Sequence, residues 1–482
     1  MGNYHATLTL INRIDGKMEV MRFSIFILLL FFFIQPLVFA QTADEDDPFR
    51  RDPIFTTSID ELFGRSEQDE PGDVTKRPHE PDDFNRAVRR LSVSGLDLGG
   101  SFEAGPYYSS ALYSQYPNLP TFHFNRVNGL FFSIRRERMQ WHRHGSFLDI
   151  PYIQPHGFIG YGTASKDWEY AIGLEKLIGA NRRFMIGAEY YNATGTEDFR
   201  RVGLVESSIT AFFAGYDYLD YHKMEGFGIY SVYRTRRWLE TSFSYNSTNY
   251  QTLFQNTTYS LFGFASTHRP NPAIDEFSDH INLDIYSISV SLNPRKVLIS
   301  NYFTAAGNVI AEFADNGQSD EDYRFNKYRA DASFYYNFEP GSVLKWKIQA
   351  GGITGNAPDF KDFYLGGIGT LRGSPFKFFK GNQMLASNIE VQLGRPSGRA
   401  GEWIRDYNLH LLFFLDSGWV GEIPELDESG NPFKGFNQFS FKDLQHDAGI
   451  GIGSGVVRFE LAWPLKTFDS TPIFWFRLNP TF

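Results

Sequence analysis

The chain has 482 residues, a formal net charge of −10 and no cysteine. The lack of cysteine excludes a disulfide framework, thiol catalysis and a cysteine-based zinc site. The negative charge argues against a protein that binds nucleic acid through a basic face.

Residues 21–40 have the parts of a secretory signal peptide. Arg22 gives a positive start, residues 23–34 are a mainly apolar run, and small residues suited to cleavage close the segment. The alternative is a membrane anchor, but the run is shorter than the ~20 residues of a spanning helix, and Pro36 interrupts its end. We expect export, with residues 1–20 as a misassigned start.

Residues 41–90 are acidic and rich in proline, and we expect a short, largely disordered periplasmic tail. Within it, residues 58–63 and 83–91 space their apolar side chains as short helices do. These helices could dock on a partner or plug a cavity. A plain tether between the signal peptide and the rest of the chain is the other reading, and both stay open.

From about residue 91 to residue 482 the apolar residues recur with period two, as in β-strands. Residues 384–394, 407–419 and 456–463 show it most clearly, whereas residues 192–225 and 247–280 give no clear pattern. A soluble β-sandwich also alternates. Here the polar face carries both charge signs and aromatic residues, 17% of the chain, gather at strand ends. That pattern is typical of a barrel in lipid. We predict an all-β protein, a transmembrane antiparallel β-barrel of sixteen strands with a polar lumen.

The end of the sequence is a strand of the same kind. Phe474, Phe476 and Leu478 alternate onto the predicted lipid face, Arg477 lies opposite them, and Phe482 ends the chain. A last strand ending in phenylalanine resembles the targeting signal of bacterial outer-membrane barrels. We therefore expect an integral protein of the cell outer membrane, in contact with its lipid.

Residues 353–383, called the lid loop here, hold the most informative segment of the chain. Gly366, Gly367 and Gly373 surround Arg372. A phosphate cradle would need a helix directly after the glycines, and another strand follows instead. An arginine among glycines needs a carboxylate that can accept its fork. Period two places Glu390, Asp416 and Gly418 on the polar face of the following strands.

These segments resemble the BamA/TamA superfamily, also called the bacterial surface antigen domain. The resemblance is carried by the glycine-rich segment 366–373, by 388–392 and by Phe414-Leu-Asp-Ser-Gly-Trp419. It implies that the lid loop folds into the lumen and that Arg372 locks against Glu390 and Asp416. The aromatic residue usual after Arg-Gly is replaced by a serine, so Phe376 is expected to serve in its place.

Weaker parts of the resemblance lie upstream, at residues 125–131, 216–221 and 225–226. The family's insertases carry POTRA domains, and residues 41–90 are too short and polar for one, so the chain resembles a barrel-only subgroup. The resemblance implies a role in inserting or translocating proteins or lipids, with client outer-membrane proteins and no cofactor. The alternative is a passive pore, or an anchor for a partner that binds residues 41–90.

Several other features were weighed as sites. Three glycines of one strand (Gly449, Gly451 and Gly453) either leave room for the lid loop or bend the strand. His142 and His144 lack further ligands for a metal, and residues 427–431 lack the spacing of a calcium loop. No serine and histidine pair suggests a lipid hydrolase, so we expect no enzyme and no metal.

Overall fold

The fold is described by a computed structural model over residues 122–136, 153–178, 183–198, 201–236, 238–263, 268–293, 302–315, 323–339, 342–394, 409–424, 431, 433–454, 457–467 and 471–478. The signal segment, the tail 41–90, both histidines of residues 142–144, the segment 427–430 and Phe482 lie outside these residues. No helix in the described part of the chain is long and apolar enough to cross a membrane.

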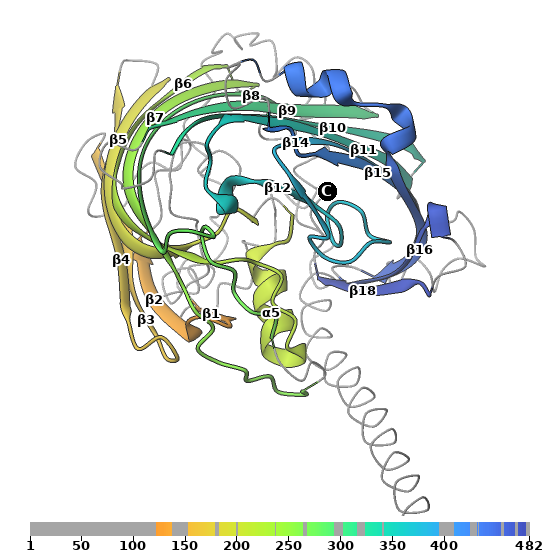
Figure 1. Cartoon of the computed structure of the whole chain (residues 1–482), viewed down its shortest axis with the longest axis horizontal. Coiled ribbons are helices and arrows are strands. Elements are labelled where there is room, and N and C mark those ends of the chain that lie inside the picture. The colour runs from red at the N-terminus through yellow and green to blue at the C-terminus, as the bar shows by residue number, and fades with distance from the viewer. Residues whose placement is uncertain are drawn as a thin grey trace, which may run out of the picture.

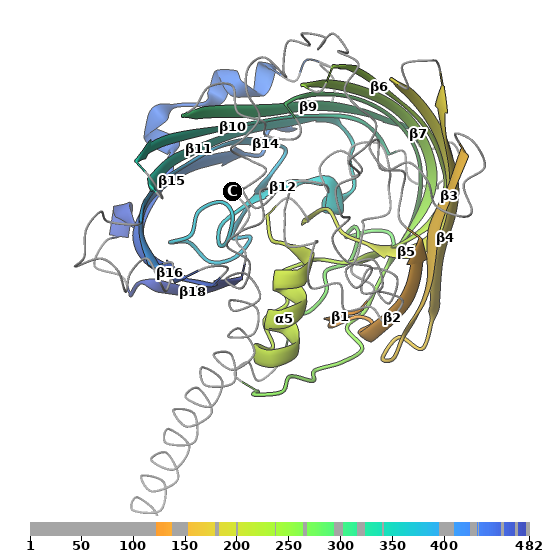
Figure 2. The same cartoon turned by 180° about the vertical axis from the view of Figure 1, so that it is seen from behind.

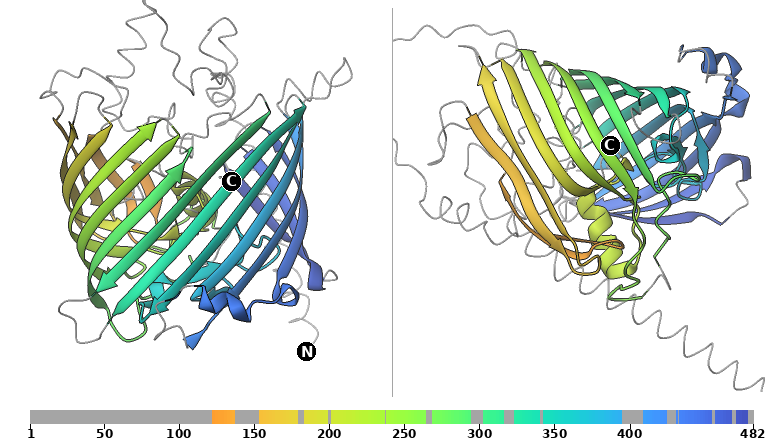
Figure 3. Two further views of the ribbon diagram at one scale, coloured as in Figure 1. Left: turned by 90° about the horizontal axis from the view of Figure 1, so that it is seen from above. Right: turned by 60° about the vertical axis from the view of Figure 1, so that its left-hand side comes forward.

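In the part of the chain that the structure describes, sixteen antiparallel strands form one sheet and follow one another in chain order, which confirms the strand number and direction predicted from the sequence. The sheet curls around a lumen with tilted strands (Figures 1 and 3). Its strands are β1 (Phe122–Asn125), β2 (Gly129–Arg136), β3 (Ile153–Gly162), β4 (Trp168–Ile178), β5 (Phe184–Gly195), β6 (His222–Arg236), β7 (Leu239–Thr252), β8 (His280–Leu292), β9 (Phe303–Asp315), β10 (Arg324–Glu339), β11 (Ser342–Gly355), β14 (Gln383–Gly394), β15 (Leu409–Gly421), β16 (Gln445–Ser454), β17 (Val457–Pro464) and β18 (Ile473–Leu478).

The wall is apolar outside and polar inside, the reverse of a soluble protein. On β4, Trp168 is 58% exposed and Ile172 is 65% exposed, while Glu169 and Glu175 are each 1% exposed. The outward apolar side chains continue on β15, where Leu411 and Phe413 are exposed. Apolar surface of this extent is stable against acyl chains rather than water.

Most of the longest connections lie at one end of the barrel, because successive strands alternate in direction. They are residues 196–221, 253–279, 356–382 and 422–444, whereas at the other end only two residues separate β6 from β7, β10 from β11 and β16 from β17. Outer-membrane barrels have long loops outside the cell and short turns in the periplasm. The lid loop therefore enters the barrel from the predicted outer side.

The lid loop lies within the ring of strands in Figures 1 and 2, and the bonds from its Arg372 to Asp416 and Glu390 of the wall place it inside the barrel. It contains the 3-10 turn η3 (Asp359–Lys361) and a small hairpin, β12 (Phe363–Leu365) and β13 (Phe379–Gly381). Three further 3-10 turns, η6 (Lys434–Gln438), η7 (Phe441–Asp443) and η8 (Leu465–Thr467), lie between the last strands.

The helix α5 (Leu204–Ala214) interrupts the β pattern within residues 192–225, which show no clear periodicity. It ends at Gly215, whose φ of 81° is in the left-handed region that favours glycine at a helix C-terminus. It lies in the gap between β1 and β18, and the front and back views agree on this position (Figures 1 and 2).

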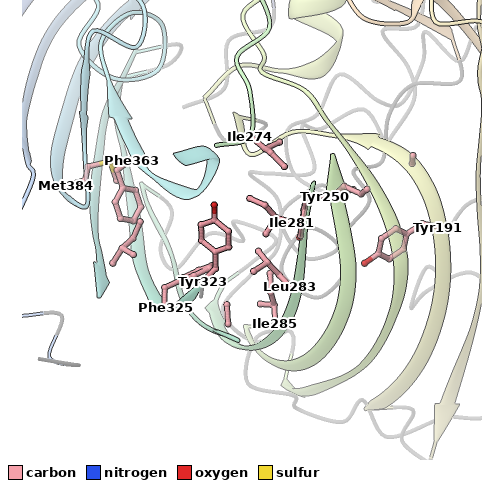
Figure 4. Packing of buried hydrophobic residues seen from close by; sticks show 14 of the residues in the cluster. Tyr191, Tyr250, Ile274, Ile281, Leu283, Ile285, Tyr323, Phe325, Phe363 and Met384 are labelled. Atoms are coloured by element: carbon pink, nitrogen blue, oxygen red, sulfur yellow. The ribbon is translucent and has the colours of Figure 1, made fainter. Parts of the chain in front are cut away.

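The lumen is not polar throughout, which corrects the sequence-based expectation. Ile281, Leu283 and Ile285 of β8 point inward and are almost fully buried. They belong to an apolar cluster that Phe363 of the lid loop and Ile274 of the segment 253–279 complete (Figure 4). Loops that fold into the lumen bring apolar side chains with them, and part of the inner wall is apolar to receive them.

Candidate functional site

Arg372 lies at the tip of the lid loop and meets two carboxylates of the barrel wall. Its Nε and Nη2 donate to the two oxygens of Asp416, each at 2.7 Å, and its Nη1 donates to Glu390 at 2.6 Å. The structure thus brings Arg372 together with Glu390 and Asp416, which the period-two pattern places on the polar face and which the resemblance implies as its partners. The two parallel bonds to Asp416 are the planar fork geometry that arginine makes with a carboxylate.

The surroundings of Arg372 keep it charged and fixed. The guanidinium lies over the ring of Phe414, 3.5 Å from the ring centre. Glu460 accepts a further bond from its Nη1 at 3.3 Å, and Arg458 donates to Glu390. Burial opposes the charge, but Asp416, Glu460 and Glu390 raise the pKa of Arg372 well above its usual value. We call these six residues the Arg372 cluster.

The glycines of the lid loop are required by its backbone. Gly366 and Gly367 have φ of 114° and 76°, in the region that side chains disfavour. A Cβ on Gly367 would lie 2.7 Å from the ring of Phe376, and a Cβ on Gly373 would lie 2.6 Å from the backbone of Trp463. The loop can therefore reach the wall only with glycine at these positions.

Ser374 fills the position where the resemblance implies an aromatic residue. Its hydroxyl and the backbone N–H of Gly373 both donate to Asp447 of β16, at 3.3 and 2.8 Å. Phe376 packs against the ring of Tyr218 and under the guanidinium of Arg269. Its contacts are thus with other segments than those of Ser374, and its service in place of the usual aromatic residue stays a prediction.

The wall glycines make room for other side chains. A Cβ on Gly418 would lie 2.7 Å from Leu365 of the lid loop, so the loop packs directly on this position. A Cβ on Gly449 would lie 2.1 Å from the ring of Phe414. Gly449 thus leaves space for the ring under Arg372, and its contact with the lid loop is indirect.

The other side of the lid loop is fixed by a second set of charges that the sequence did not reveal. Lys377 donates to Asp198 at 2.6 Å and to Asp220 at 2.5 Å. Asp220 also pairs with Arg126 at 2.9 Å and with Arg269. Burial opposes ionisation of Asp220, but Lys377 and Arg269 outweigh it and lower its pKa to about 2. We call these five residues the Lys377 cluster.

Arg126 joins two of the weaker motifs of the sequence. Its backbone N–H and Nη1 donate to Asp217, at 2.9 and 3.2 Å, and its side chain is fully buried. The segments 125–131 and 216–221 therefore meet, although they are far apart in the chain. The only sign of this contact in the sequence is that both motifs contain charged residues. Neither the burial of an arginine nor its partner can be read from one sequence.

Lys361 extends this side of the lid loop further. It donates to Glu197 at 2.6 Å, and Arg201 donates to the carbonyl of Tyr364. Burial disfavours the charge on Lys361, but Glu197 and Glu312 raise its pKa above its usual value. The lid loop is thus held between the strands β14–β18 and the segment 196–221.

The last strand differs in part from its expected orientation. Phe474 is 50% exposed on the outer face, and Phe476 is partly buried. Leu478 is 8% exposed, so the expectation that it faces lipid is wrong. Its end of β18 lies against α5 instead, as the bond from the Leu478 N–H to Glu206 shows. Among the described residues no group of His, Asp and Glu could hold a metal ion.

No family model and no curated protein matches the chain. Solved structures that resemble it include BamA from Haemophilus ducreyi lacking POTRA domains 1–3, with 14% identity and a TM-score of 0.44 over 74% of this chain and 68% of that one. CdiB from Acinetobacter baumannii has 12% identity and a TM-score of 0.35 over 64% and 49%. CdiB from Escherichia coli has 13% identity and a TM-score of 0.36 over 67% and 54%.

Proposed function

We propose that this protein is an outer-membrane barrel that aids the insertion or translocation of proteins or lipids, without covalent chemistry. The observation that carries the proposal is that neither edge of the described sheet is paired with a further strand. In the described part of the chain β1 pairs with β2 alone and β18 pairs with β17 alone. A strand edge that lacks a partner can accept a strand from another chain.

A second observation supports a barrel that is more than a channel. The lid loop lies in the lumen and is fixed there by buried ion pairs on two sides. A passive pore works best with a water-filled interior, whereas this interior is occupied. The Arg372 cluster would act as an inner latch. It would hold the lid loop beside the last strands while a strand of another chain pairs with an edge of the sheet.

The alternative function is a structural barrel that anchors a partner through residues 41–90. The acidic composition of that tail favours a basic partner. Under this alternative the barrel would serve as a membrane anchor only, and the levels of other outer-membrane proteins would not depend on it.

Depletion of the protein in its own cells separates the two functions. The proposed function predicts lower amounts of other outer-membrane proteins or of surface lipid within a few generations. Re-expression of the wild type is the positive control, and re-expression without residues 41–90 tests the anchor. Unchanged amounts of all outer-membrane components after full depletion would contradict an assembly role. A large and steady conductance of the purified protein in planar bilayers would favour the pore.

A further inference from the structure

The gap between the first and last strands is occupied by a helix. In the front and back views α5 lies between β1 and β18 (Figures 1 and 2). It comes from the connection between β5 and β6, far in sequence from both edge strands. A helix at this place has no counterpart elsewhere in the described wall, where every strand is bordered by strands on both sides.

The helix takes up hydrogen bonds at the edge of β18. The carboxylate of Glu206 accepts from Nε and Nη2 of Arg477, at 2.7 and 3.3 Å, and from the backbone N–H of Leu478 at 3.0 Å. The side chains of Glu206 and Arg477 are 1% and 2% exposed. A backbone N–H at a sheet edge would otherwise pair with a neighbouring strand, so Glu206 stands where a strand carbonyl would stand.

The same helix contacts the edge of β1. The hydroxyl of Ser208 accepts from the backbone N–H of Phe124 at 2.7 Å. The ring of Phe212 packs edge-on against the ring of Phe124, with 5.5 Å between their centres. Both edges of the sheet are therefore bonded to successive turns of one helix.

The two faces of α5 follow the polarity of the barrel wall. Glu206, Ser207 and Thr210 are buried, whereas the apolar side chains of the other face are partly exposed. That face consists of Leu204, Val205, Ile209, Phe212 and Phe213. A helix with its charge buried and its apolar side chains exposed matches the strands, which bury charge and expose apolar residues.

We propose that α5 is the closing element of the barrel wall, a helical seal that occupies the hydrogen-bonding edges of β1 and β18 until another strand replaces it. Tyr259 and Phe262 pack against Phe212 and Phe213 at one end of the apolar face, and the remainder of that face contacts lipid. The second part of the proposal rests on the proposed function, because a client strand can pair with either edge only after Glu206 and Ser208 leave it. The seal itself stands without that function.

The lid loop is connected to this seal. Trp475 of β18 donates to the backbone carbonyl of Arg372 at 2.7 Å, so the last strand contacts the tip of the lid loop directly. On the other side, Ser207 of α5 donates to Asp217 at 3.0 Å, and Asp217 also holds Arg126 of the Lys377 cluster. Release of the lid loop would therefore weaken the support of β18 and of Asp217, the two neighbours through which α5 is connected to the loop.

Cross-linking tests the position of the helix, and the absence of native cysteine makes introduced pairs unambiguous. In intact outer membranes, a short bismaleimide should join the pair Phe124→Cys and Ser208→Cys. Ser242→Cys with Ser289→Cys is the matched control, since these hydroxyls lie 2.6 Å apart on the neighbouring strands β7 and β8. If the control pair at residues 242 and 289 is cross-linked and the pair at residues 124 and 208 is not, the proposal of a helical seal is refuted.

Conductance tests the sealing itself. Glu206→Ala and Arg477→Ala should each raise the conductance of the purified barrel in planar bilayers several-fold. Arg234→Ala removes a wall ion pair with Glu240 between β6 and β7, strands that are hydrogen-bonded to each other, and should leave conductance unchanged. Equal conductance of wild type, Glu206→Ala and Arg477→Ala would refute the proposal.

The link to function is tested last, with the cross-linked helix pair in cells that depend on the protein. A cleavable cross-linker between residues 124 and 208 should stop client assembly, and cleavage should restore it, while the control pair has no effect. If client assembly continues while residues 124 and 208 are cross-linked, α5 does not have to leave β1 for the protein to act. If depletion already shows no client, the proposed function fails, and the cross-linking and conductance results still decide whether α5 closes the wall.

Discussion

At the scale of single residues, Arg372 is the most constrained side chain of the lumen. It is 3% exposed and bonded to three carboxylates, and its backbone carbonyl is bonded to Trp475. A charge inside a protein needs such partners, because an unpaired buried ion is unstable. The arginine therefore explains why acidic residues stand on β14, β15 and β17, at positions where a barrel without a lid loop would not need them.

Removal of the arginine should destabilise the barrel. Arg372→Ala leaves Glu390 and Asp416 buried without their main partner, and breaking a buried pair in this way costs about 3–5 kcal/mol. We expect the barrel to lose its resistance to heating in detergent gels at a lower temperature than wild type.

Two further variants make this result specific. Arg372→Lys keeps the charge but not the fork, so it should fall between wild type and Arg372→Ala. Lys380→Ala removes an ion pair with Asp359 of the same loop. Both side chains of this pair are at least 40% exposed, so its loss should lower the stability of the barrel by only about 0–1 kcal/mol. An Arg372→Ala barrel as heat-resistant as wild type would show that the latch does not exist.

At the scale of elements, the lid loop joins two parts of the barrel that are distant in sequence. Arg372 holds it to the strands after it, and Lys377 holds it to the segment between β5 and β6. The segment 196–221 in turn carries α5. The lid loop is therefore a brace between the last strands and the helix at the edge of the sheet.

The Lys377 side of this brace should weaken in acid. The pKa of Asp220 is lowered to about 2 in the folded protein, whereas an unfolded aspartate titrates near ~3.9. A lowered pKa stabilises the fold above the unfolded value, and this contribution is lost as the pH falls from about 4 towards 2. Asp220→Asn should thus be less heat-resistant than wild type at neutral pH, and the difference should narrow below about pH 4. A difference that stays constant from pH 7 to pH 2.5 would contradict the ion pairing of Asp220.

At the scale of the whole molecule, the distribution of side chains is that of a protein in lipid. Glutamates of β4 are buried while isoleucine and tryptophan of the same strand are exposed. The charged side chains of the sheet point into the lumen, where loops and ion pairs provide their partners. Its apolar side chains point outward, where they pack against acyl chains.

A charge placed on the outer face should therefore be costly. Ile172→Arg puts a guanidinium at a position that is 65% exposed, and in a bilayer such a change costs about 2–4 kcal/mol near the midplane. Phe441→Arg, at a position 80% exposed in a loop, should be nearly neutral. Urea unfolding of both variants from lipid vesicles measures the difference. Equal stability of the two would mean that β4 does not face lipid.

The sequence by itself determined the all-β class and the two faces of its clearest strands, with Glu390 and Asp416 on the polar face. It could do so because period two fixes the face of every residue in a strand. The strand number also depended on the rule that bacterial single-chain barrels have an even number of strands, and the meeting of Arg372 with the two carboxylates was implied only by the family resemblance.

Only the tertiary structure decided how the sheet ends. Neither α5 nor the contacts of Arg126, Lys377 and Leu478 could be read from the sequence, because each depends on which loop reaches which edge of the sheet. The helix is short, and its stability comes from contacts with β1 and β18 rather than from its own residues. Local patterns specify strands, whereas the position of a loop inside a barrel depends on partners that lie far away along the chain.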